Sequence, residues 1–465
     1  MNTNSRGATR PLRITGIRIA KLAATVVAAS MLLAACSQSA SGPDNVTRWY
    51  TLGDPTVENQ KAWVSLNVDR FTEQYPDVTV NTVNVPQDTL EQKQKVALAA
   101  GTGPDIITTP GSANAIPYAA AGYLADLSDA AETNDWASHI LPWALNIGYV
   151  DGKLVSLPVN YETLVLYYNE TLFDENGWDV PTDRASLVKL AGEMQGKGII
   201  PFAAGNGSWQ AATEWLVSAY FNQVAGPSMF HDAIAGEASF SDPDMVASIQ
   251  MMKDDFAAGW YAGGVKQYFT TQDPQKYAQF ADGEAAMMVS GSWDMLSFGD
   301  YFGADANTND WAWAPLPPLA DGVPSDVYPL SIGGTISINA NSKSIENSTN
   351  YISWLFSDTA NMWAGVAAEI SGPSPIKYDP SDVPADVDPR YAAHYQAIND
   401  ASEVGNVGYV TWTSFSPKSE GFVLDNADKV INGDMSAEEF CAGLEAVFVV
   451  DRAAGLVPPL FSTGG

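Results

Sequence analysis

The sequence predicts an α/β protein in which three stretches of the chain cross between packed regions. Apolar strands alternate with amphipathic helices along most of its 465 residues, an order typical of βαβ units on a largely parallel sheet. Three stretches have the character of crossings rather than packed elements: 157–161, the proline-rich 314–329, and 371–380. Three crossings divide the chain into four pieces, which can form two lobes of two pieces each. The length also allows two or three domains.

The first part of the chain alternates between the two periodicities. Helical spacing of apolar residues ends at a proline in one segment and at a glycine in the next, as expected at helix ends. The pattern predicts strands at 46–53, 78–85 and 104–110, and helices at 58–76 and 89–103.

The middle and the end of the chain repeat this alternation. The pattern predicts strands at 153–159, 163–169, 199–205, 284–290 and 335–343, and helices at 184–198, 209–226, 245–260, 274–283, 345–366 and 436–450. The last of these helices opens with Ser436 as its N-cap and Glu439 three residues later, which predicts a capping box.

The first 35 residues predict an export signal. Five basic side chains and no acidic one precede the uncharged run 22–36, which is too short to span a bilayer comfortably as a helix. The signal ends in Leu33-Ala34-Ala35-Cys36, which resembles a bacterial lipobox. That resemblance implies cleavage before Cys36 and a diacylglyceryl group on its thiol; an ordinary signal with a chance cysteine is the alternative. The small polar residues of 36–45 predict a flexible tether.

The chain that remains after cleavage is strongly acidic. Removal of residues 1–35 leaves 18 basic side chains against all 54 acidic ones, a net charge of −36. Such a charge repels nucleic acid and polyanionic surfaces, so we predict no nucleic-acid partner. Cys441 is the only other cysteine and cannot pair with a lipidated Cys36. Its helical spacing among apolar residues is typical of a small core residue.

Motifs for metals and cofactors are absent from the sequence. His139, His231 and His394 lie far apart, without metal-ligand spacing. The aspartates of 379–388 lack the glycine and the terminal glutamate of an EF-hand loop. We therefore predict no metal and no cofactor.

Five segments, taken together and in order, resemble one protein family. They are 103–129, 157–182, 277–295, 333–357 and 431–448. They are similar to the extracellular solute-binding proteins of bacterial ABC importers, in the carbohydrate-binding subgroup that includes the maltose-binding protein. Nearly all of the mature chain takes part in this likeness.

The resemblance implies the periplasmic-binding-protein type II fold, in which two α/β lobes hold a ligand in the cleft between them. It places 46–160 with 330–371 in one lobe, and 161–329 with 372–465 in the other. The three crossings then become the hinge.

Loops at strand ends carry the candidate site. In open α/β sheets, ligands lie beyond the carboxyl ends of strands. Two such loops place a tryptophan directly after Gly-Ser, at Trp209 and Trp293. Glycine permits close approach of the backbone, serine offers a hydroxyl, and an indole presents a flat apolar face to a sugar ring. The alternative is that both tryptophans belong to the core.

The first crossing carries Asn160, Tyr161 and Glu162. Glu162 precedes Asn169 by seven residues, the spacing at which the maltose-binding protein carries a sugar-binding glutamate. A carboxylate can accept charge-assisted hydrogen bonds from two neighbouring sugar hydroxyls. The alternative is that Glu162 belongs to a solvated hinge surface.

The remaining candidates come from loops that the resemblance covers less well. After Gly111 the sequence lacks the aromatic and charged residues of the maltose-binding protein, so a maltose-like pose does not transfer. The further candidate ligand-binding residues are Ser112, Asn114, Ser292, Asp294, Gly334 and Trp412.

These observations together predict a sugar receptor. We expect a monomeric lipoprotein on the outer face of the cytoplasmic membrane of a Gram-positive bacterium, with no catalytic residues. It would capture a neutral oligosaccharide by lobe closure and deliver it to ABC permease subunits with a cytoplasmic ATPase. The alternatives are a secreted glycoside hydrolase, or the same fold with a polyol, peptide or glycerol phosphate as its ligand.

Overall fold

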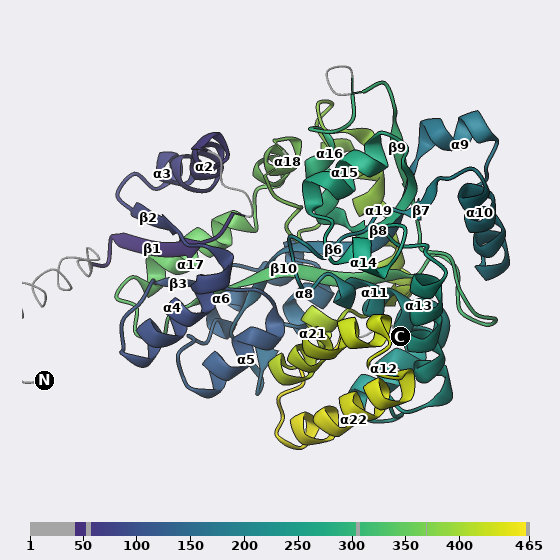
Figure 1. The fold of residues 1–465 in the computed structure, drawn as a ribbon. Helices are drawn as coiled ribbons and strands as arrows, with labels where there is room; N and C mark the ends of the chain where they lie inside the picture. Colours follow the sequence, from purple (N-terminus) through teal and green to yellow (C-terminus); the bar gives the residue numbers. More distant parts are fainter. Residues whose placement is uncertain (1–41, 53–56, 304–306, 369, 462–465) are drawn as a thin grey trace, which may run out of the picture.

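The computed structural model describes residues 42–52, 57–303, 307–368 and 370–461. Figure 1 shows two groups of elements side by side, with the purple and blue N-terminal elements on the left and most teal and yellow elements on the right. The predicted signal 1–35, Cys36 and most of the predicted tether lie outside the described residues.

The last residues of the predicted tether contact the body. The backbone oxygen of Gly42 accepts a hydrogen bond from Ser344 Oγ at 2.7 Å, and that of Pro43 accepts one from Asn347 Nδ2 at 2.7 Å. Gly42 and Pro43, which belong to the predicted tether 36–45, therefore pack against the body of the protein.

One nine-stranded sheet runs through the molecule in the order β2-β1-β3-β10-β6-β8-β7, with β11 beside β10 and β9 beside β6. Its strands are β1 (Asn45–Tyr50), β2 (Thr79–Asn84), β3 (Ile106–Thr109), β6 (Leu157–Asn169), β7 (Ile200–Phe202), β8 (Ala285–Gly291), β9 (Trp311–Ala314), β10 (Tyr328–Ile338) and β11 (Val407–Gly408). A separate hairpin pairs β4 (Tyr149–Val150) with β5 (Lys153–Leu154).

The sheet is mixed, whereas the sequence predicted a largely parallel one. Strand β1 is parallel to β2 and β3, and β7 is parallel to β8, as expected for βαβ units. Strand β6, however, is antiparallel to β8, β9 and β10, and β10 is also antiparallel to β3. The difference arises because the strands that carry the chain between the lobes belong to the sheet.

The first crossing is therefore a packed element. The segments predicted as separate strands at 153–159 and 163–169 are mostly one long strand, β6, which includes 157–161. The first half of β6 pairs with β10 from Leu157 to Thr163, and its second half pairs with β8 from Leu164 to Tyr168. A single strand thus links the two lobes. It carries the chain from one lobe to the other and is also a paired strand of the sheet.

The helices are arranged in three runs along the chain. Before β6 lie α2 (Val57–Val64), α3 (Arg70–Gln74), α4 (Gln87–Ala99), α5 (Ser112–Ala120), α6 (Ser128–Thr133), α7 (Trp136–His139) and α8 (Pro142–Asn146). Between β6 and β10 lie α9 (Glu170–Asn176), α10 (Arg184–Gly196), α11 (Thr213–Tyr220), α12 (Pro227–Ala235), α13 (Pro243–Ala257), α14 (Val265–Tyr268), α15 (Asp273–Ala281) and α16 (Met295–Phe298). After β10 lie α17 (Ile345–Leu355), α18 (Thr359–Ala367), α19 (Pro389–Val404), α20 (Thr411–Ser414), α21 (Pro417–Asn432) and α22 (Ala437–Ala453).

Two predicted helices are interrupted. The helix predicted at 345–366 is divided into α17 and α18, because the Asp358 side chain accepts a hydrogen bond from the backbone N–H of Asn361 at 3.0 Å and caps a new helix. The helix predicted at 58–76 contains a π-helical turn at Ser65–Asp69 between α2 and α3.

The core confirms the prediction from helical spacing for Cys441. Met245, Ile249 and Met252 on α13 are fully buried, and so is Cys441 on α22. The Cys441 sulfur lies 3.7 Å from the backbone oxygen of Met245, so this cysteine is a small core residue as predicted. The capping box is also present at the start of α22.

No helix in the described part of the chain is both long enough and apolar enough to cross a membrane.

A buried ion pair joins α10, α11 and α13. Arg184 Nη1 and Nη2 donate to the Asp255 carboxylate at 2.6 Å each, and the Tyr220 hydroxyl donates to the same carboxylate at 2.6 Å. Removal of one partner leaves the other charge without compensation in a poorly solvated place.

We therefore expect Asp255→Ala to lower the free energy of unfolding by about 3 kcal/mol, measured by urea denaturation. The neighbouring Asp254 is exposed, and Asp254→Ala is expected to change it by less than about 0.5 kcal/mol. Equal effects of the two substitutions would contradict this role of the ion pair.

Candidate functional site

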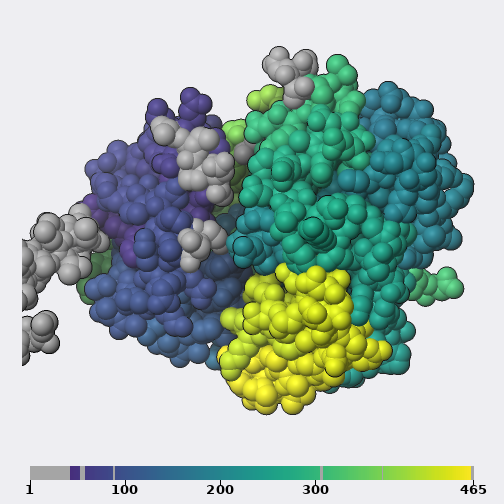
Figure 2. Space-filling model, viewed as in Figure 1, coloured from purple at the N-terminus to yellow at the C-terminus, as the bar shows by residue number. Residues whose placement is uncertain are grey.

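Two adjoining cavities lie between the lobes. Cavity A has a volume of about 270 Å³ and cavity B of about 620 Å³. Residues that line both are Thr51, Thr108, Glu162, Trp293 and Gly333. The two cavities therefore form one cleft, bounded by the carboxyl ends of β1, β3 and β8 and by the crossing strands. Figure 2 shows the two halves of the molecule that meet along this boundary.

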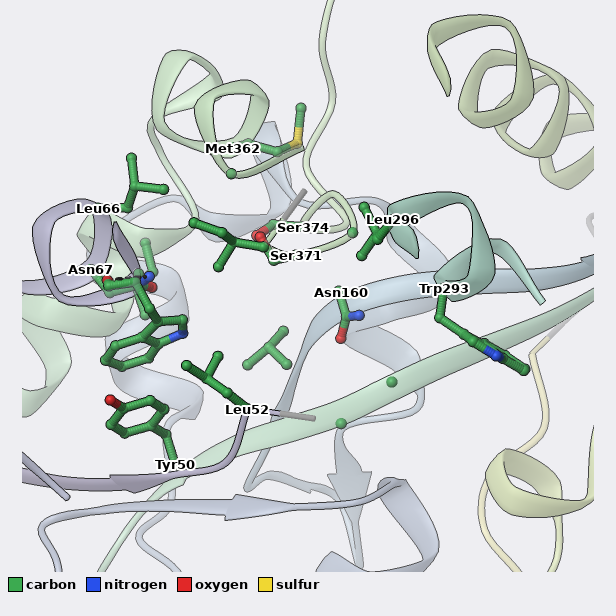
Figure 3. Close-up of a pocket in the computed structure, with 18 of the residues that line it drawn as sticks. Tyr50, Leu52, Leu66, Asn67, Asn160, Trp293, Leu296, Met362, Ser371 and Ser374 are labelled. Carbon is green, nitrogen blue, oxygen red and sulfur yellow. Dashed lines mark hydrogen bonds between the residues drawn. The ribbon is translucent and has the colours of Figure 1, made fainter. Parts of the chain in front are cut away.

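The floor of the cleft is the pairing of β6 with β10. The Asn160 amide donates to Glu162 Oε1 at 3.1 Å. Both side chains lie against Gly333, where an added Cβ would clash with the Glu162 carboxylate and would lie 2.6 Å from Asn160 Nδ2. Only glycine leaves room for the two polar groups at this point. Figure 3 shows Asn160 between the side chains of the first lobe and Trp293.

Burial changes the acidity of Glu162. Loss of hydration raises the pKa of its carboxyl to about 7. The hydrogen bond from Asn160 favours the charged form and lowers the pKa, but by less. Glu162 can therefore act either as a hydrogen-bond acceptor or as a donor near neutral pH.

The loop after β8 places Trp293 at the junction of the two cavities. Its ring lies 5.1 Å from that of Trp215 and 5.9 Å from that of Trp412 between centroids. The neighbouring Asp294 points away from the cleft. It accepts hydrogen bonds from Lys276 Nζ at 3.1 Å and from the Tyr277 hydroxyl at 2.7 Å, and so fixes the loop to α15.

The first lobe supplies the other wall of cavity A. The rings of Tyr50 and Trp63 are stacked with centroids 3.7 Å apart, and the Arg48 guanidinium lies over the same Trp63 ring at 4.9 Å. Arg48 Nη1 donates to the Tyr351 hydroxyl at 2.9 Å. Tyr50 is visible in this wall in Figure 3. This wall was not predicted, because Tyr50 and Trp63 have the spacing of ordinary core residues.

Eight of the eleven predicted binding residues line the cleft. Glu162 and Trp293 line both cavities; the residues at cavity A alone are Asn160, Ser292 and Gly334, and those at cavity B alone are Asn114, Trp209 and Trp412. No bound ligand tests these residues, so their role stays a prediction.

The other three predicted residues lie in the interior. Tyr161 is fully buried because neighbouring residues of a strand point to opposite faces, and Asn160 and Glu162 take the cleft face. The Ser112 hydroxyl donates to the backbone oxygen of Thr413 at 3.0 Å and ties α5 to α20. Asp294 holds Lys276, as described above.

Cavity B contains glutamates that the sequence analysis missed. Glu214 on α11 is 4% exposed, and its Oε2 accepts from the Thr411 hydroxyl at 2.9 Å. Burial and the nearby Glu420 carboxylate raise the pKa of Glu214 to about 8. Burial and Glu91 raise the pKa of Glu420 to about 7. Helical spacing alone marks Glu214 and Trp215 as ordinary helix residues, so no sequence signal identified them.

Two of the aspartates of 379–388, Asp379 and Asp388, cap helices. Asp379 accepts from the backbone N–H and hydroxyl of Ser381, and Asp388 accepts from the backbone and guanidinium of Arg390. Within the described residues, no group of three His, Cys, Asp or Glu side chains is arranged to hold a metal ion.

Comparison with known proteins gives a consistent result. Residues 54–362 match the model of the bacterial extracellular solute-binding protein family. The Multiple sugar-binding protein of Streptococcus mutans is 28% identical over 280 residues, which are 57% of this chain and 62% of that protein. The Maltooligosaccharide ABC transporter solute-binding lipoprotein of Streptococcus pneumoniae is 25% identical over 320 residues, 64% of this chain and 67% of that protein. Matches to the first curated relatives span from about a third to three fifths of their length.

Solved structures share the fold. A chitin oligosaccharide binding protein superposes with a TM-score of 0.74 at 22% identity, covering 88% of this chain and 99% of its own. Maltose-bound T. maritima MalE3 superposes with a TM-score of 0.66 at 17% identity, covering 87% and 99%. The predicted fold class, two α/β lobes with a ligand cleft, is confirmed.

The raised pKa values of the cleft predict a pH-dependent stability. In the folded protein Glu214 and Glu420 keep their protons up to pH values of about 8 and 7, whereas in the unfolded chain they lose them near 4.5. The folded state therefore binds more protons in this interval, and stability falls as the pH rises from about 4.5 to about 8. Glu420→Gln removes one of these groups and is expected to flatten the fall in Tm. Glu403→Gln, an exposed change on α19, is the matched control and should reproduce the wild-type slope.

Proposed function

Because this chain belongs to the bacterial extracellular solute-binding protein family, as its resemblance predicted, we propose that it captures a carbohydrate for an ABC importer. The observation that carries the proposal is the cleft between the lobes. Indole faces and carboxylates line it together, which is the combination that a sugar ring with its apolar face and its hydroxyl rim requires. The names of the streptococcal relatives, a sugar-binding protein and a maltooligosaccharide-binding lipoprotein, support this ligand class.

Binding would be coupled to closure of the two lobes. A ligand that contacts both walls stabilises the closed arrangement, because it gains contacts there that the open arrangement lacks. Strands β6 and β10 pass beneath the cleft and would act as part of the hinge. The lobe boundaries at 160, 330 and 371 fall in or beside these strands and the third crossing. The closed form would then dock on permease subunits that a cytoplasmic ATPase drives, with the receptor acting as a monomer.

The direct test is calorimetric titration with a panel of neutral di- and oligosaccharides. We expect binding near micromolar, about −8 kcal/mol, for at least one of them. Trp293→Ala removes the indole at the junction of the two cavities and is expected to weaken binding at least about tenfold. The control is Trp178→Ala, since Trp178 lines neither cavity. A lack of binding across the panel would refute the proposed ligand class.

The same incubations separate a receptor from an enzyme. A glycoside hydrolase needs two carboxyl groups on either side of the scissile bond, roughly 5 to 9.5 Å apart. We propose that the glutamates of the cleft bind ligand without cleaving it. Mass spectrometry should therefore recover the bound oligosaccharide intact, and new reducing ends would instead support hydrolysis. If the protein prefers a polyol, a peptide or glycerol phosphate to every sugar, the proposed ligand class is wrong although the fold is unchanged.

We further propose that Cys36 carries a lipid anchor. The lipobox-like Leu33-Ala34-Ala35-Cys36 supports this, together with the pneumococcal relative that is named as a lipoprotein. Two or more acyl chains give stable attachment where a single chain is marginal. The protein would then stay on the outer face of the cytoplasmic membrane of a Gram-positive cell, beside the permease.

Cys36→Ala is expected to move the protein from the membrane fraction to the medium or to block its processing, as followed by immunoblot of cell fractions. Cys441→Ala is the control, because Cys441 lies in the core of the folded body. Membrane retention of a correctly cleaved Cys36→Ala chain would exclude the anchor.

A further inference from the structure

Cavity B combines acidic and aromatic side chains without a basic one. Among the described residues that line it, the four glutamates are Glu91, Glu162, Glu214 and Glu420. No lysine, arginine or histidine lies among these described lining residues. When these glutamates are ionised, no basic side chain among the described lining residues compensates their charge.

Two of these carboxylates are poorly compensated by hydrogen bonds as well. Glu214 is 4% exposed and accepts one hydrogen bond, from Thr411, on one of its two oxygens. Among the described residues the Glu420 side chain takes part in no hydrogen bond or ion pair. A carboxylate that is removed from water without such partners is costly, and two adjacent ones repel each other.

The lobes bring a third carboxylate toward this pair. Glu91 belongs to α4 of the first lobe, whereas Glu214 and Glu420 belong to α11 and α21 of the second lobe. Glu91 and Glu420 both line cavity B, and the charge of Glu91 adds to the effect of burial in raising the pKa of Glu420. Lobe closure would therefore bring together carboxyl groups that repel each other once they are ionised, unless a positive group lies between them.

The aromatic side chains of cavity B suit a cation. Trp215, Trp293 and Trp412 form a continuous wall, and Trp209 is 47% exposed at the cavity surface. A cation is attracted to the face of an indole. Lys276 already makes a cation–π contact with this wall, since its Nζ lies 5.6 Å from the centroid of the Trp215 ring. That lysine is neutralised by Asp273 and Asp294 at 3.1 Å each, so it does not compensate the glutamates.

We propose that cavity B binds a sugar unit that carries a protonated amino group, with the ammonium group between Glu214, Glu420 and the indole faces. This inference rests on the proposed function and specifies the substrate class of the same cleft. A neutral sugar carries no positive charge that could replace the protons held by Glu214 and Glu420. An ammonium group favours the ionised form of both glutamates, which release their protons to the solvent. It then makes charge-assisted hydrogen bonds with both carboxylates and offsets the repulsion between them.

The test compares two disaccharides that differ in charge. The purified protein is titrated at about pH 7 with the β-1,4-linked glucosamine disaccharide and with its N,N′-diacetyl form, which is neutral. We expect the amino form to bind at least about tenfold more tightly, and this preference to shrink as salt is added.

Single substitutions identify the groups responsible. Glu420→Gln keeps the shape of the side chain and removes its charge, so the preference for the amino form should fall to about threefold or less. Glu214→Gln should have the same effect; because Glu214 is buried, its Tm is measured in parallel. Glu403→Gln is the matched control: it changes the net charge equally but lies outside the cleft, so it should keep the full preference.

Three results would overturn the inference. The first is equal or tighter binding of the acetylated disaccharide by the wild type, which would mean that protons alone relieve the glutamate pair. The second is a higher affinity for the acetylated disaccharide when choline chloride replaces sodium chloride in the buffer. That result would indicate that a free cation, and not the amino group of the sugar, occupies the site in cavity B. The third is no binding of either disaccharide; the neutral panel described above would then still decide the proposed function independently.

Discussion

The antiparallel pairing of β6 with β10 is the interaction on which the rest of the structure depends. These two strands join the lobes, because β6 pairs with β10 in its first half and with β8 in its second. They also form the floor of the cleft, since Asn160 and Glu162 project from β6 over Gly333 of β10. The same backbone hydrogen bonds thus hold the molecule together and position its most polar candidate residues.

Close approach at glycines determines the shape of the cleft around this floor. A Cβ at Gly291 would clash with the Trp293 ring, and a Cβ at Gly111 would lie 2.6 Å from the backbone oxygen of Trp412. The absence of a side chain at Gly291 thus makes room for the Trp293 ring, and its absence at Gly111 makes room for the backbone of Trp412. Trp293 and Trp412 are therefore held by backbone packing as well as by ring contacts.

Charge is the second constraint on the cleft. Two buried carboxylates elsewhere have a cation as partner, since Asp255 pairs with Arg184 and Asp294 with Lys276. In cavity B the glutamates lack such partners among the described residues, and burial raises the pKa of both Glu214 and Glu420. A binding cleft can retain groups of this kind because its ligand, or a proton, supplies the missing interaction.

The α/β class, the family and the two Gly-Ser-Trp loops could be predicted from the sequence, because alternation, motif order and local spacing are properties of the chain alone. The sequence also led to Glu162 and Asn160, through their spacing on the first crossing. Tertiary structure decided that Tyr161 and Ser112 turn into the interior, that the sheet is mixed, and that Glu214 and Glu420 meet Glu91 in one cavity. These residues are distant in sequence, and their burial, charge coupling and orientation arise only when β6 and β10 bring the two lobes together.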